Sequence, residues 1–75
     1  MELLTSIVIV DVVNKEYLWQ DAASFPTEGW SKSLQNADKF RDREEAIASI
    51  TNGDTYLRDL VRYAVIEFKE IHEVR

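Results

Sequence analysis

The 75-residue chain has no cysteine, one proline, two glycines and one histidine. Without cysteine it forms no disulfide bond and no thiolate zinc site, and it has no cysteine nucleophile. The two glycines, Gly29 and Gly53, stand alone, so the chain has no glycine-rich phosphate loop. The single histidine, His72, has no second histidine or cysteine with which to ligate a metal. We therefore expect a domain held together by packing, with no metal site and no cofactor.

Basic residues are also in the minority, 9 against 14 acidic ones, which gives a formal net charge of −5. This balance argues against a general binder of the phosphate backbone. The apolar run over 7–13 is broken by Asp11 and is too short to span a membrane, and no basic flank of a signal peptide precedes it. A mass of 8.7 kDa with 45% hydrophobic residues predicts one small folded domain over residues 1–75, in the cytoplasm.

The N-terminal part of the sequence predicts a β-hairpin. Residues 5–13 are dense in β-branched side chains and apolar on both faces, which is typical of a strand inside a sheet or covered on both sides. A polar break over 14–16 has the length of a hairpin loop, and a strand resumes over 17–20. After a loop, Trp30 opens a short third strand.

A helix is predicted over 42–51, because Asp42 is a suitable N-cap and Glu45 follows it three residues later. An apolar stripe at helical spacing comes next, and Asn52-Gly53 is a typical stop.

The last third of the sequence fits two structures, since apolar residues repeat at helical spacing from Leu57 to Phe68 while 63–74 is rich in strand formers. A strand over 62–73, preceded by a short helical turn near 55–60, is favoured over one long helix. The elements together predict an α+β fold, with a small antiparallel sheet of three to four strands and one helix packed on a face.

One pattern of aromatic and apolar residues runs through the first two thirds of the chain. It consists of Tyr17-Leu18-Trp19, Gly29-Trp30, Leu34, Ala37, Phe40 and Arg43-Glu44-Glu45-Ala46. In this pattern the chain resembles short phage and prophage accessory proteins, over about residues 5–50. The resemblance implies that the closing segment is a strand beside the first one, and that the protein is phage-encoded. It implies no activity, and the connection over 52–62 departs from the pattern.

The candidate catalytic groups have simpler interpretations. His72 would need a nucleophile and an orienting carboxylate, and a solvated surface histidine is the better interpretation. The carboxylate pairs, Glu44 with Glu45 and Asp38 with Asp42, match helix capping and the helix dipole better than acid–base work. We therefore predict that the protein is not an enzyme.

Aromatic residues point instead to an interaction with another protein. Two tryptophans and a phenylalanine either fill the small core or anchor an interface, where tryptophan is enriched among hot spots. We predict a non-enzymatic interaction module, including the case of a phage-encoded modulator of a host protein. The partner is expected on the loop over 21–33, centred on Phe25 and Trp30 and rimmed by Trp19, Lys32 and Arg41.

Alternatives to this function stay open. The aromatic and locally basic stretch over 30–43 could bind a nucleic acid strand weakly, although acids among its bases cancel much of the charge. The 14 acids could instead imitate a phosphate backbone, which requires them to line one face with few bases. A homodimer through an exposed sheet edge is also open.

Overall fold

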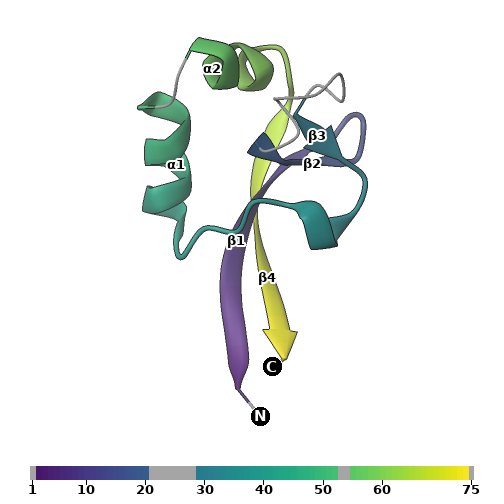
Figure 1. Ribbon diagram of the computed structural model, residues 1–75, viewed down its shortest axis with the longest axis vertical. Helices are drawn as coiled ribbons and strands as arrows, with labels where there is room; N and C mark the ends of the chain where they lie inside the picture. Colours follow the sequence, from purple (N-terminus) through teal and green to yellow (C-terminus); the bar gives the residue numbers. More distant parts are fainter. Residues whose placement is uncertain (1, 21–28, 53–54, 75) are drawn as a thin grey trace.

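A computed structural model describes residues 2–20, 29–52 and 55–74, the last range without the side chains of residues 55–57. Four strands form one antiparallel sheet in the order β3-β2-β1-β4, and two helices pack on one of its faces (Figure 1). The elements are β1 (Leu3–Asp11), β2 (Glu16–Leu18), β3 (Trp30–Ser31), α1 (Arg43–Thr51), α2 (Thr55–Arg62) and β4 (Ile66–Val74). This arrangement confirms the predicted α+β fold. Neither helix is long and apolar enough to cross a membrane within the described part of the chain.

β1 is an inner strand of the sheet, as its apolar residues on both faces predict. Along one edge it pairs with β4 through nine consecutive residue pairs. Along the other edge its C-terminal end pairs with β2. Nearer its start, Ile7 exchanges two backbone hydrogen bonds of 2.8 and 2.9 Å with Phe40. The first strand therefore contacts the last strand, the second strand and the segment before α1.

Each face of β1 contributes to its own buried cluster. The cluster on the helix-covered face consists of Ile9, Leu18, Phe40, Ala46 and Val61. The cluster on the opposite face consists of Val8, Ala37 and Ile71. Val8 and Ile9 belong to different clusters because successive side chains of a strand point to opposite faces. Ala37 and Phe40 also belong to different clusters. Both come from the segment that follows β3, which includes the short 3-10 helix η2 (Leu34–Asn36).

β1 ends at Asp11, two residues before its predicted end, because the Asp11 carboxylate caps the turn that follows. Its Oδ1 accepts hydrogen bonds from the N–H groups of Val13 (3.0 Å) and Asn14 (3.2 Å), and its Oδ2 accepts one from the Asn14 side chain (2.9 Å). The side-chain bond from Asn14 is the main cause that lowers the pKa of Asp11, against the opposing effect of burial. β2 is also shorter than predicted and ends at Leu18.

α1 begins where its cap predicts, since Asp42 accepts a hydrogen bond of 2.8 Å from the Glu45 N–H. That bond is the main cause that lowers the pKa of Asp42. The Glu45 carboxylate in turn accepts from the N–H of Arg41 at 3.2 Å, one residue before the cap itself. The predicted stop is only partly described: Asn52 has a φ of −101°, which is not left-handed, and Gly53 lies outside the described residues.

The last third of the chain is a helix followed by a strand. α2 is eight residues long and extends past the predicted turn over 55–60. β4 begins at Ile66, four residues later than predicted, and ends one residue later. The helical spacing of apolar residues is therefore used in α2, and the run of strand formers is used in β4. β4 pairs beside β1, as the resemblance implies.

Replacing Asp11 tests the turn between β1 and β2. Asp11→Ala removes three hydrogen bonds, and we expect it to lower the free energy of unfolding by about 1–3 kcal/mol in urea denaturation at pH 7. Because the pKa of Asp11 is lowered in the folded state, the charged carboxylate stabilises the fold above its unfolded pKa. This contribution is lost as the pH falls through the folded pKa of Asp11. The difference in free energy of unfolding between the wild type and Asp11→Ala should therefore become smaller in acid.

The control is Asp59→Ala, which removes an exposed carboxylate from α2. We expect it to stay within about 0.5 kcal/mol of the wild type at both ends of the pH range. A stability difference for Asp11→Ala that does not change with pH contradicts the role of its charged form.

Candidate functional site

The structure places the residues predicted to bind a partner in two locations. Trp19 directly follows β2, Trp30 begins β3, and Lys32 follows β3 as an exposed residue, so these three lie around one end of the sheet. Arg41 lies at the start of α1, and Figure 1 shows that helix and β3 on opposite sides of β1. Phe25 lies outside the described residues.

The backbone around Trp19 is held by three other segments of the chain. The N–H of Trp19 donates to the carbonyl of Gly29 at 2.8 Å, and the N–H of Asp38 donates to the last carbonyl of β2 at 2.9 Å. The carboxylate of Asp38 accepts from the N–H of Gln20 at 2.9 Å. The side chain of Gln20 donates to the hydroxyl of Ser49 in α1 at 3.3 Å. Trp19 is therefore fixed on both sides along the chain.

The two tryptophan side chains differ in their surroundings. Trp30 is partly buried and packs against the cluster on the helix-covered face. Trp19 is partly buried as well, but it belongs to neither cluster among the described residues. Trp30 thus packs against a described cluster, whereas Trp19 is half-buried outside both described clusters.

Gly29 allows β3 to approach α2 closely. Its φ of +80° lies in the left-handed region, which residues other than glycine adopt only at a cost in conformational energy. A Cβ at this position would stand 2.5 Å from Cδ1 of Leu60. The same buried glycine accepts the backbone hydrogen bond from the Trp19 N–H, so its close approach to α2 fixes the position of that acceptor.

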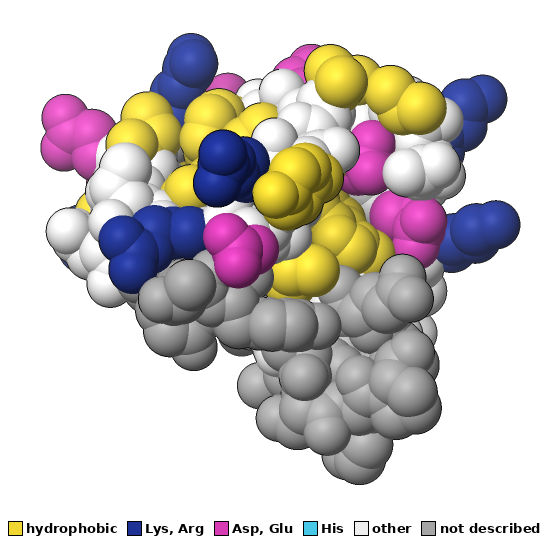
Figure 2. All heavy atoms as spheres, turned by 90° about the horizontal axis from the view of Figure 1, so that it is seen from above, with side chains coloured by type: hydrophobic (Ala, Val, Ile, Leu, Met, Phe, Trp, Pro, Cys, Tyr) yellow, Lys and Arg dark blue, Asp and Glu magenta, His cyan; other side chains and the backbone are white. Residues whose placement is uncertain are grey.

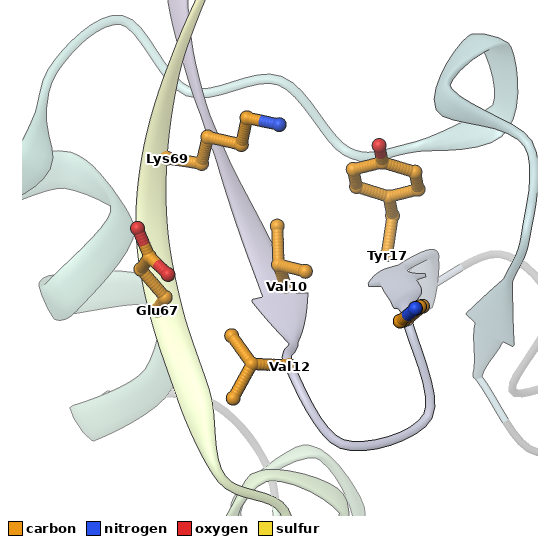
Figure 3. Close-up of a pocket in the computed structure, with 6 residues that line it drawn as sticks. Val10, Val12, Tyr17, Glu67 and Lys69 are labelled. Carbon is orange, nitrogen blue, oxygen red and sulfur yellow. The ribbon is translucent and has the colours of Figure 1, made fainter.

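A hollow of about 300 Å³ opens on the sheet face opposite the helices (Figure 3). Its lining consists of Val10, Val12, Lys15, Tyr17, Glu67 and Lys69. In Figure 3 the two valines lie between β2 and β4, and the ammonium group of Lys69 points across β1 toward the tyrosine. The volume is at the lower end of the range for ligand sites. The lining combines the apolar surface of two valines and a tyrosine with the charged groups of two lysines and a glutamate.

Polar groups also meet around His72 on β4. Its Nδ1 lies 3.1 Å from the hydroxyl oxygen of Thr5, and its Nε2 lies 3.4 Å from Oε1 of Glu70. A hydroxyl, an imidazole and a carboxylate thus stand in the order of a catalytic triad. All three residues are exposed, and the hollow described above lies on the other face of the sheet. The exposure agrees with the interpretation of His72 as a solvated histidine.

The charges of the described surface are mixed in sign. Figure 2, which views the molecule from the end that carries the helices, shows acidic and basic side chains interspersed among hydrophobic ones. On β4, Lys69 stands between Glu67 and Glu73 on one face. Within residues 2–20, 29–52 and 55–74 no group of three or more histidines and carboxylates could hold a metal ion.

Asp38 is the residue beside the candidate site whose contact sequence reasoning misses. The sequence suggests a pair with Asp42, but the structure gives the two carboxylates separate tasks. Asp42 caps α1, and Asp38 holds Gln20 across a separation of 18 residues. No local spacing signals a bond between positions so far apart.

Comparisons with protein-family models, with curated proteins and with solved structures gave no match. The interpretation of the site therefore rests on the residues and the geometry of this chain.

The close approach at Gly29 is tested by Gly29→Ala. The left-handed φ and the contact with Leu60 should together lower the free energy of unfolding by about 1–3 kcal/mol in urea denaturation. The matched change is Lys15→Gly, at the described non-glycine residue with a positive φ, 56°. It should stay within about 0.5 kcal/mol of the wild type, because relief of strain is offset by a more flexible unfolded chain. Wild-type stability for Gly29→Ala contradicts the approach of β3 to α2.

Proposed function

We propose that this protein is a non-enzymatic module that binds another protein, with Trp19 as the central anchor and with Trp30 and Lys32 beside it. The observation that carries the proposal is the fixed backbone of Trp19, whose side chain belongs to neither buried cluster of the described residues. Tryptophan is among the residues enriched at interface hot spots. A partner with an apolar pocket and an acidic rim would suit this tryptophan and the exposed lysine.

The way in which Trp19 is held favours binding energetically. Ordering a side chain and its loop at an interface costs free energy, and a residue that is already fixed avoids part of that cost. The hydrogen bonds through Gly29, Asp38 and Gln20 provide this order in the free protein. The module therefore presents Trp19 in one backbone conformation before a partner arrives.

We further propose that the module is a phage-encoded modulator of a host protein. The support is the resemblance of the sequence to short phage and prophage accessory proteins. Several residues of that pattern, among them Leu18, Phe40 and Ala46, belong to the buried cluster on the helix-covered face. The likeness is therefore in part a likeness of core residues. The proposed phage origin rests on the pattern as a whole.

The proposal is tested by capturing a partner from bacterial lysate on the immobilised protein, identifying it by mass spectrometry and measuring its affinity by calorimetry. Trp19→Ala should stay folded and bind about 30- to 1,000-fold more weakly, the loss expected for an anchor worth about 2–4 kcal/mol. Trp30→Ala should instead lower the free energy of unfolding by about 2–4 kcal/mol, since Trp30 packs against the core.

Arg41→Ala is the control for binding and should leave the affinity unchanged, because Arg41 directly precedes the cap of α1, a helix that Figure 1 shows on the side of β1 away from β3. Phe25→Ala in the same assay tests the sequence-based assignment of Phe25 to the contact. Wild-type affinity for Trp19→Ala, or failure of the wild type to capture any protein reproducibly, contradicts the proposal.

A further inference from the structure

One edge of the sheet is long, and no strand within residues 2–20, 29–52 and 55–74 pairs with it. β4 is the last strand in the sheet order, and its nine residues pair with β1 without interruption of the register. Open edges are usually protected by short strands, charged side chains, prolines or bulges. β4 has no proline and its ladder has no bulge, whereas β3 at the other edge is two residues long. Among the described residues no strand pairs with the outer edge of β4, and the charged side chains of β4 are the edge protection that a partner strand must match.

The hydrogen bonds of the ladder determine which backbone groups face this edge. Val12 donates to the carbonyl of Val65 at 2.9 Å, which places position 65 in a hydrogen-bonded pair with β1. Such pairs alternate along an antiparallel ladder, so the odd-numbered residues of β4 bond to β1. The even-numbered residues direct their N–H and C=O groups outward, and these are Ile66, Phe68, Glu70, His72 and Val74.

The far part of this ribbon extends beyond the helices. Figure 1 shows β1 and β4 running together past the rest of the molecule to the two chain ends. At that tip the paired residues Leu3 and Val74 are 63% and 62% exposed. A ribbon of two strands is marginal on its own, and additional strands stabilise it.

We propose that β4 pairs antiparallel with β4 of a second copy of the chain, with the two-fold axis at Ile71. This register joins two four-stranded sheets into one continuous sheet. The cross-strand pairs are Phe68 with Val74, Lys69 with Glu73, Glu70 with His72, and Ile71 with itself. Because the interface is symmetric, each pair of unlike residues occurs twice.

The hydrogen-bonding pattern and the side chains agree on this register. The pairs Phe68–Val74 and Glu70–His72 consist of even-numbered residues, whose backbone groups already face outward. The apolar pair covers the exposed Val74 on the helix-covered face. The Glu70 carboxylate of each copy stands opposite the His72 imidazole of the other, whose Nε2 already lies 3.4 Å from Oε1 of Glu70 in its own chain.

The charged pairs add to the match. Lys69 stands opposite Glu73 in both halves of the interface, and pairs of opposite charge stabilise directly opposed positions of a sheet. Ile71 meets its own copy beside the cluster of Val8 and Ala37.

Neighbouring registers lose these matches. The next register in one direction places Glu70 opposite itself and Glu67 opposite Glu73, which repels at three positions. The next register in the other direction leaves five paired residues and places His72 opposite itself and Ile71 opposite Glu73. The register on Ile71 is therefore favoured over the first neighbour by charge and over the second by the length of the ladder.

A charge swap tests the interface in the full chain. We expect the wild type to sediment at twice its mass of 8.7 kDa at micromolar concentration. Lys69→Glu and Glu73→Lys each place like charges opposite one another twice, and each should weaken dimerisation roughly tenfold or more. An equimolar mixture of the two variants should dimerise again, because every like-charged pair becomes an opposite one.

The mixture separates dimerisation from folding, because two misfolded variants would not repair one another. Glu73 also lies 3.8 Å from Lys39, an exposed contact of small energetic value, so thermal unfolding of Glu73→Lys is recorded alongside. Lys32→Glu, the same charge change near the opposite edge, should dimerise as the wild type does. A wild type that stays monomeric, or a mixture that does not recover, overturns the proposal, as does a dimer that tolerates both single variants. A monomer that accepts a peptide strand of another protein at β4 overturns it equally.

Discussion

The pairing of β1 with β4 is the interaction on which the other elements depend. It joins the first and last parts of the chain through nine residue pairs, and it makes β1 an inner strand. Val8 and Ile9 are completely buried on opposite faces of β1, so one strand contributes to both clusters. Burial of each such side chain is worth about 1.5–3 kcal/mol. β2 and the segment with Phe40 pair with β1, and the two helices pack on side chains of β1 and β4.

The same pairing separates two surfaces at opposite edges of the sheet. The anchor residue Trp19 lies where β2 and β3 meet, and the edge proposed for a second copy is β4. Because β1 and β2 lie between them, use of one surface leaves the other accessible. A dimer through β4 would carry two Trp19 sites at its outer ends, and two linked sites raise the avidity for a partner with repeated binding sites.

The sequence predicted correctly those elements that are determined by residues close together in the chain. The β-branched residues of β1 and the cap at Asp42 led to the correct strand and helix, and the pattern around Trp30 to the correct short strand. The early end of β1 depends on the side chain of Asp11, which replaces strand pairing with turn bonds. The end of α2 and the start of β4 depend on pairing with β1, a contact between distant segments. The hydrogen bond from Gln20 to Asp38 also joins distant segments. The sequence therefore singles out Trp19 but does not predict the contacts that hold its backbone.

The measurement that bears most directly on this account is hydrogen exchange of the β4 amides, resolved by residue with NMR at a low and a high protein concentration. The odd-numbered amides, including Lys69 and Ile71, should be protected at both concentrations because they bond to β1. The even-numbered amides of Phe68, Glu70 and His72 should exchange rapidly at the low concentration and become protected at the high one. Rapid exchange of the odd-numbered amides would contradict the β1–β4 ladder, and even-numbered amides that stay unprotected at the high concentration would contradict pairing with a second copy.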